Sequence, residues 1–288
     1  MKKLFYLLFA GALLLPFSCN QNDKTKTDEV KMEEPSTKHA ATVIHFKDQN
    51  PTLSIQGTDA AVTKLEFMEA SRFLLRYNAP TKAAEPAEKV LAGRFSFHNG
   101  VYEIPGIGSV KINGSAVDIT PHSGEPVSIN ATVTPTTTSN DPLFNAARNW
   151  KVEDVILTLK GGSIAIEKKF DGCNLEEMAK YATEHGVLLD VKQFKGMDVD
   201  EIILSGANTF LITFKNVDVE PFYGTFNIDG ERFDYKLVKG NDLLNVDAEG
   251  HLIFTEKGKC NLKISVATTY VNGVFYRGSA EFDLYESE

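Results

Sequence analysis

The chain has 288 residues, with 30 Lys and Arg against 39 Asp and Glu, and a formal net charge of −9. This length allows one large domain or two of ordinary size, and 42% hydrophobic residues suit a packed core rather than a mainly disordered chain. The acidic balance provides no clustered basic surface, so we expect no nucleic-acid partner.

The first residues are typical of a secretory signal, which we assign to residues 1–18. Lys2 and Lys3 give a basic start, and residues 4–17 form an apolar stretch that is short for a membrane span. Cys19 follows at once. This arrangement resembles a bacterial lipoprotein signal, in which cleavage leaves the cysteine as a lipid-modified N-terminus.

The residues before Cys19 match the usual lipoprotein motif in part. Pro16, Phe17 and Ser18 stand where most such signals have Leu, a small residue, and Gly or Ala. Relaxed motifs that end in Ser-Cys resemble those of Bacteroidetes envelope lipoproteins. The resemblance implies that a lipid at Cys19 attaches the protein to a membrane, and it favours the outer membrane. Whether the protein faces the periplasm or the cell surface is left open. The alternative is an ordinary signal peptide with an incidental cysteine. Residues 19–39 are polar and predict a disordered tether.

The chain after residue 40 contains an internal repeat. Val62–Tyr77 aligns without gaps on Val199–Phe214, with apolar residues at matching positions. Gly93–Phe97 then matches Gly224–Ile228, and each copy continues with a turn and an aromatic strand. Matches in the same order along both halves indicate a duplication.

The apolar residues alternate along short segments bounded by turns, which predicts a mainly β fold. We expect two related antiparallel meander domains, each a small barrel, half-barrel or sandwich, at residues 40–134 and 150–288. Residues 135–149 form the linker, with a short helix predicted from Pro142 to Trp150. One amphipathic helix is predicted in the second domain, at residues 174–186.

Two local signals are specific enough to predict contacts. Asn174 and Glu177 have the spacing of a capping box at the start of the amphipathic helix. Asn272-Gly273 suits a type I′ hairpin turn, because both residues tolerate positive φ. That turn would place Tyr270 opposite Phe275 on neighbouring strands.

The second copy also resembles lipocalin-like domains, loosely and over about half the chain. Trp150 opens its first strand, a helix follows early, and a meander leads to a long closing hairpin. Lipocalins carry Gly before that Trp, whereas this chain has Asn149. The resemblance implies a small barrel and bears on fold more than on function.

The second copy contains two cysteines, Cys173 and Cys260. In an oxidising compartment they could pair, and a bridge would stabilise the fold by roughly 4 kcal/mol. The alternative is two buried free thiols that pack as small hydrophobic groups. The sequence favours the thiols, because nothing in it brings the two Cα atoms within bridging range.

The acidic residues give one weak metal candidate. Asn245, Asp247, Glu249 and Glu256, with Gly250 between them, have the oxygen spacing of a calcium loop. The flanking residues are typical of strands rather than helices, so we favour a hairpin turn that starts at Asp247 and ends at Gly250. No metal site and no cofactor is therefore expected.

The functional alternatives remain open at this point. We favour a non-catalytic binding role in the cell envelope, with a small apolar ligand, a glycan or an envelope protein as the partner. A second hypothesis is a hydrolase that assembles a site from scattered carboxylates such as Glu66, Glu103 or Asp234. A third is a structural component that pairs through sheet edges. The acidic residues Asp198, Asp200 and Glu201 are expected at a solvated strand end.

Overall fold

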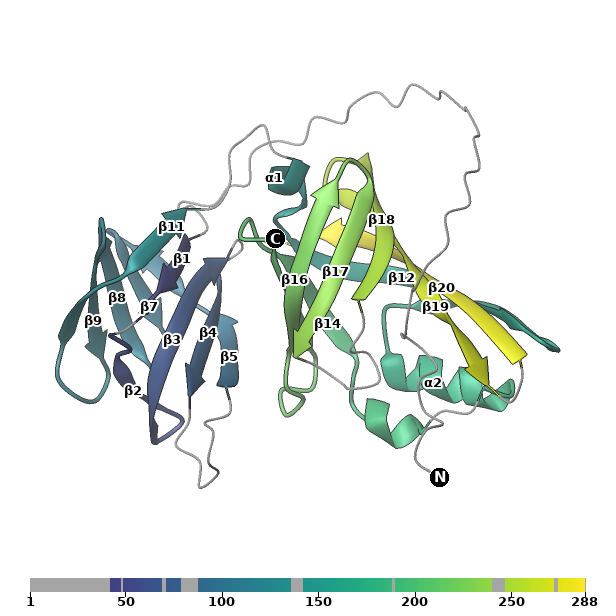
Figure 1. Ribbon diagram of the computed structural model, residues 1–288, viewed down its shortest axis with the longest axis horizontal. Helices are drawn as coiled ribbons and strands as arrows, with labels where there is room; N and C mark the ends of the chain where they lie inside the picture. Colours follow the sequence, from purple (N-terminus) through teal and green to yellow (C-terminus); the bar gives the residue numbers. More distant parts are fainter. Residues whose placement is uncertain are drawn as a thin grey trace. The chain divides into compact units, whose positions relative to one another are not determined.

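The computed structural model confirms a mainly β chain (Figure 1). It describes residues 42–47, 49–68, 71–78, 88–135, 142–187, 190–239, 247–271 and 274–287. The chain divides into two compact units, an N-terminal one from Pro35–Arg148 and a C-terminal one from Asn149–Leu204 and Asn208–Glu288. The predicted signal, the tether and Cys19 lie outside the described residues.

The N-terminal unit contains two antiparallel sheets. The first has the order β11-β1-β3-β4-β5, with β2 paired to β3, and the second has the order β10-β9-β8-β7-β6. The strands of the first sheet are β1 (Thr42–His45), β2 (Thr52–Ile55), β3 (Thr58–Met68), β4 (Arg72–Asn78), β5 (Glu88–Arg94) and β11 (Thr132–Pro135). Those of the second are β6 (Ser96–His98), β7 (Val101–Ile104), β8 (Gly108–Asn113), β9 (Ala116–Pro121) and β10 (Val127–Asn130). The chain passes from one sheet to the other at Phe95 and again at Ala131.

Aromatic rings fill the space between these two sheets. Phe67 of β3 stacks on Tyr102 of β7, with ring centroids 3.8 Å apart and planes 15° apart. Phe95 contacts both rings edge-on, at centroid distances of 5.0 and 5.4 Å. These rings belong to one buried core that draws on both sheets.

The C-terminal unit contains a closed barrel. Its sheet has the order β13-β12-β14-β15-β16-β17-β18-β19-β20, and β20 also pairs with β12, so that eight of these strands close on themselves. The strands are β12 (Asn149–Gly161), β13 (Ile164–Asp171), β14 (Val199–Leu204), β15 (Thr209–Phe214), β16 (Phe222–Asp229), β17 (Arg232–Lys239), β18 (Asp247–Glu256), β19 (Lys259–Val271) and β20 (Val274–Glu286). Helix α2 (Leu175–Glu184) and the 3-10 turn η1 (Val191–Phe194) connect β13 to β14.

The two units share a hairpin with the same register, as the repeat predicts. Leu65 pairs with Leu75 in β3–β4, and the aligned Ile202 pairs with Ile212 in β14–β15. Each hairpin also has a register shift at the same aligned place. It lies between Val62 and Lys64 in the first copy and between Val199 and Glu201 in the second.

The next strand of each copy repeats a second detail. Phe73 lies opposite Gly93 in the N-terminal unit, and Phe210 lies opposite Gly224 in the C-terminal unit. In both cases a Cβ atom on the glycine would overlap the phenylalanine ring, at 2.8 Å from the first ring and 2.5 Å from the second. The missing side chain therefore makes room for the ring in both copies, which supports the duplication.

Helix α2 agrees with its predicted start. The Asn174 side chain accepts a hydrogen bond of 3.0 Å from the backbone N–H of Glu177, which satisfies one of the free donors of the first turn. The helix ends at Glu184, and Gly186 follows with a φ of 95°. Among the described residues, no helix is long and apolar enough to cross a membrane.

Helix α1 is shorter than predicted. It covers Pro142–Ala146 rather than continuing to Trp150. The reason is that Asn149 and Trp150 already belong to β12, where they pair with Ile203 and Ile202 of β14. Backbone pairing in the barrel therefore overrides the local helical pattern.

The closing hairpin has its predicted register. Tyr270 of β19 lies opposite Phe275 of β20, while the turn at Asn272-Gly273 lies outside the described residues.

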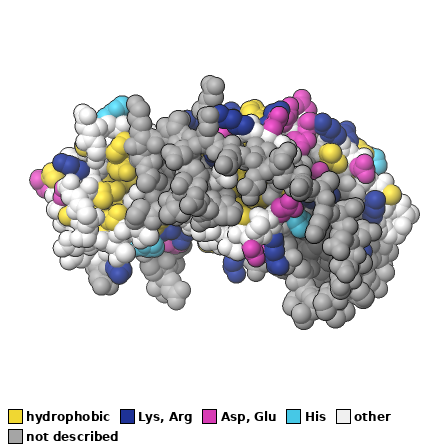
Figure 2. All heavy atoms as spheres, turned by 90° about the horizontal axis from the view of Figure 1, so that it is seen from above, with side chains coloured by type: hydrophobic (Ala, Val, Ile, Leu, Met, Phe, Trp, Pro, Cys, Tyr) yellow, Lys and Arg dark blue, Asp and Glu magenta, His cyan; other side chains and the backbone are white. Residues whose placement is uncertain are grey.

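Lys and Arg side chains are interspersed with Asp and Glu on the face shown in Figure 2.

Candidate functional site

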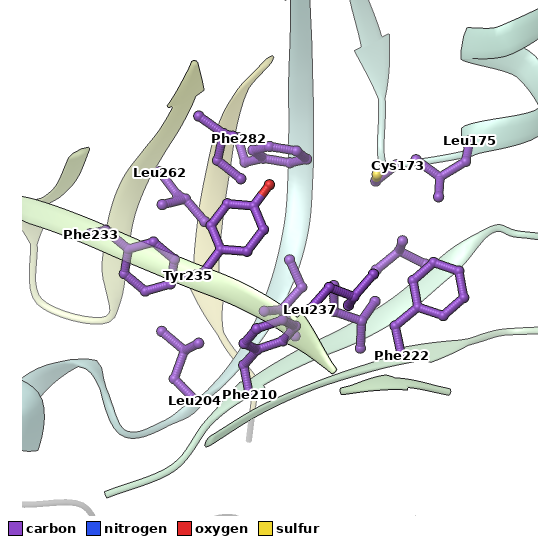
Figure 3. Close-up of a pocket in the computed structure, with 14 residues that line it drawn as sticks. Cys173, Leu175, Leu204, Phe210, Phe222, Phe233, Tyr235, Leu237, Leu262 and Phe282 are labelled. Atoms are coloured by element: carbon purple, nitrogen blue, oxygen red, sulfur yellow. The ribbon is translucent and has the colours of Figure 1, made fainter. Parts of the chain in front are cut away.

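The C-terminal barrel contains a cavity of about 110 Å³ that is partly open to solvent (Figure 3). Its walls come from β14, β15, β16, β17, β19 and β20, and from Cys173 and Leu175 at the start of α2. The aromatic members of the wall are Phe210, Phe222, Phe233, Tyr235 and Phe282. The interior of an eight-stranded barrel is just wide enough for side chains or for one small ligand.

Strand periodicity explains which side chains line this cavity. Alternate residues of a strand face the same side of a sheet, and Phe233, Tyr235 and Leu237 of β17 all line the cavity. Ile202 and Leu204 of β14 follow the same rule. The alternating pattern predicts the inward residues, but the cavity exists because their side chains leave part of the interior unfilled.

The N-terminal unit has a pair of stacked rings at the positions that align with two residues of the cavity wall. By the shared hairpin register, Leu204 is the counterpart of Phe67, and Phe233 is the counterpart of Tyr102. Phe67 and Tyr102 stack on each other, whereas Leu204 and Phe233 both line the cavity. The C-terminal unit thus lacks the counterpart of the Phe67–Tyr102 stack, and its Phe233 stacks on Phe226 instead, with ring centroids 5.4 Å apart and planes 23° apart.

The cavity wall is electrically neutral. None of the described residues that line it is Lys, Arg, His, Asp or Glu. Burial, with a smaller effect of Asp198, raises the pKa of the Cys173 thiol to about 12, so this thiol stays protonated near neutral pH. Burial also raises the pKa of Tyr235 far above its usual value, so its hydroxyl group stays neutral.

Tyr235 supplies the one hydroxyl group in this wall. Its ring contacts Phe210 edge-on at 6.0 Å and lies 6.2 Å from Phe233. Figure 3 shows the hydroxyl group directed toward Phe282. Within the described part of the chain, this hydroxyl group has no hydrogen-bond partner.

A buried polar pair lies where the barrel closes between β12 and β14. The Asn149 side-chain N–H group donates a 2.8 Å hydrogen bond to Oε1 of Glu201, and the two residues are 2% and 1% exposed. The expectation that Glu201 is solvated is therefore wrong. It is buried because β14 joins β12 through the neighbouring pairs formed by Asn149 and Trp150.

The two cysteines of the C-terminal unit are free, buried thiols. The favoured prediction of two small buried thiols is confirmed, and the alternative, a bridge between them, is not formed. Cys173 lies in the cavity wall, whereas Cys260 lies in β19 opposite Leu284.

The calcium candidate does not form a loop around an ion. Asp247–Glu256 is one continuous strand, β18, and the predicted turn from Asp247 to Gly250 is also wrong, because these residues pair with β17. Glu256 forms an ion pair with Lys259, with 2.8 Å between Oε1 and Nζ. Asn245 lies outside the described residues. The described ranges contain no cluster of three or more His, Cys, Asp or Glu residues suited to a metal ion.

The carboxylates named for a hydrolase site do not face the cavity. Glu66 is buried in β3, 3.5 Å from the Lys64 ammonium group, and Glu103 is exposed in β7. Asp234 accepts a 2.9 Å hydrogen bond from Arg232 on the neighbouring part of β17. Solvent or a local contact thus accounts for Glu103 and Asp234, whereas Oε1 of the buried Glu66 has no hydrogen-bond partner in the described part of the chain.

Comparison with known proteins gives no relatives to guide the assignment. No protein-family model matches this sequence, and no curated protein matches it. The functional argument therefore depends on the barrel cavity and its wall.

Proposed function

We propose that the C-terminal barrel binds a small apolar ligand, and that the protein does so as a lipid-anchored component of the cell envelope. The observation that carries the binding proposal is the apolar cavity inside the barrel, where the described residues of the wall include no charged side chain. Binding sites for small molecules are typically concave and apolar, with few polar groups. The mouths and interiors of barrels are common places for them.

The size of the cavity limits the ligand. An engineered apolar cavity of about 150 Å³ binds benzene, so a cavity of about 110 Å³ suits a ligand no larger than one small ring. A longer molecule would extend through the part that is open to solvent. The proposal therefore concerns a compact ligand or the compact end of a longer one.

Toluene is the probe that tests the binding proposal. We expect saturating toluene to raise the unfolding temperature of residues 20–288, which include every described residue, because a ligand of the folded state stabilises it by about 2.7 kcal/mol at 100 times its Kd. Trp150 is the one tryptophan of the chain and lies fully buried in β12, so its fluorescence reports on the unit that contains the cavity. Native mass spectrometry with solvent extraction would identify a ligand that co-purifies. No stabilisation by toluene would overturn the proposal.

The anchoring proposal is tested separately from binding. We expect the full-length chain to partition into the detergent phase of Triton X-114 after expression in a bacterium that processes lipoproteins, and Cys19→Ser to move it to the aqueous phase. Acyl chains contribute roughly 0.8 kcal/mol per buried CH₂ group, which explains so large a shift. Cys173→Ser is the matched control, because this cysteine is buried in the barrel and should leave partition unchanged. Aqueous partition of the unmutated chain would contradict the anchor.

A further inference from the structure

The Tyr235 hydroxyl group is a polar group in an otherwise apolar wall. Desolvation by burial is the sole cause of its raised pKa, with no hydrogen bond or charge contributing. The side chain nevertheless keeps some accessible surface, as expected of a residue whose open side faces the cavity. A desolvated hydroxyl group without a partner costs free energy, and a ligand that hydrogen-bonds to it removes that cost.

The same wall disfavours a charged ligand. A carboxylate in the cavity would lose its hydration, and the described part of the wall has no Lys, Arg or His to pair with it. An ammonium group would likewise find no Asp or Glu in the wall. The neutral Cys173 thiol, with its pKa of about 12, provides no charge either.

The aromatic side chains favour a flat ligand. Phe210 meets the Tyr235 ring at an interplanar angle of 85°, and Phe233 lies at 38° to it, so the neighbours of the Tyr235 ring differ in orientation. Figure 3 places Phe282 on the side to which that group points. Aromatic rings interact with one another through offset and edge-to-face contacts, which a flat ligand can make with several of these residues.

We infer that the barrel selects a neutral, ring-containing ligand with one hydrogen-bonding group, and that Tyr235 recognises this group. The inference rests on the proposed function and adds the chemical class of the ligand and its specificity-determining residue. Carboxylates small enough to lie wholly inside the cavity are excluded from the class, because no described side chain of the wall compensates their charge.

Three small probes of similar shape test the inference: toluene, phenol and benzoate. Near pH 7, we expect toluene and phenol to bind the chain of residues 20–288, and benzoate to bind at least about 100-fold more weakly than phenol. We expect Tyr235→Phe to weaken phenol binding by about threefold to tenfold, the usual effect of one hydrogen bond, and to change toluene binding less than twofold. Calorimetry or the shift in unfolding temperature gives each affinity.

Tyr181→Phe is the matched control. Tyr181 lies in α2, where its ring contacts Phe170 and His185 and does not line the cavity. This variant should bind both neutral probes as the original chain does. Trp150 fluorescence confirms that each variant is folded.

The outcomes separate the two proposals. If toluene fails to bind the original chain, the proposed function is overturned. If toluene binds and Tyr235→Phe weakens both neutral probes equally or neither of them, the cavity stands and the role of Tyr235 is wrong. Benzoate binding as tight as that of phenol would overturn the restriction to neutral ligands.

Discussion

Leu204→Phe is expected to weaken toluene binding at least tenfold. The substitution places a ring where the N-terminal unit has Phe67, and the counterpart of its partner Tyr102 is Phe233, which lines the cavity. The new ring would occupy space that is open to the probe, and one methylene group in an apolar pocket already changes affinity by about tenfold or more. The shift in unfolding temperature at a fixed toluene concentration measures the effect.

Leu204→Met is the control for this substitution. It keeps the volume of the side chain nearly constant, and such exchanges usually cost less than about 1.5 kcal/mol of stability. We expect this variant to retain toluene binding. If Leu204→Phe folds normally, as Trp150 fluorescence would show, and still binds toluene with the original affinity, the probe does not occupy this cavity.

Gly224→Ala is expected to destabilise the C-terminal unit by about 3 kcal/mol. A Cβ atom at this position would overlap the carbonyl oxygen of Lys236 on β17, and it would lie 2.5 Å from the Phe210 ring. A backbone carbonyl group in a closed barrel has little freedom to move, so both strands must shift. Urea unfolding followed by Trp150 fluorescence measures the loss.

The second copy of the repeat provides the comparison. Gly93→Ala places its Cβ atom against the Phe73 ring alone, with a closest distance of 2.8 Å. A side chain can rotate away where a backbone carbonyl cannot, so we expect this variant to cost about 1 kcal/mol in the N-terminal unit, measured by circular dichroism. Equal losses in the two variants would show that the carbonyl contact of Gly224 is unimportant.

The repeat was the most informative part of the sequence for the fold. Apolar residues at Leu65 and Ile202 alternate along their strands, and this periodicity is local, so the matching hairpins could be predicted. Helix α2 was also predictable, because its cap at Asn174 depends on residues three positions apart. By contrast, Asp247–Gly250 has turn-forming residues, yet pairing with β17 extends it into β18.

The site depends on information that one sequence does not display. The hydrogen bond between Asn149 and Glu201 joins residues 52 positions apart, and two polar residues in separate apolar segments gave no signal of it. The cavity depends on the sum of side-chain volumes around a closed barrel, which no local pattern reports. Tyr235 lies two residues from Phe233 in β17, so the alternating pattern places both on the inner face. That its hydroxyl group has no hydrogen-bond partner among the described residues can be seen only in the structure.

The glycine and phenylalanine shared by β4–β5 and β15–β16 also bear on the history of the molecule. The simplest source of this pair in both copies is one ancestral β unit that already contained it. The aligned position carries Phe67 in the packed core of one unit and Leu204 in the cavity wall of the other, with the hairpin register unchanged. After a duplication the two copies can change independently, so one can keep a packed interior while a cavity opens in the other.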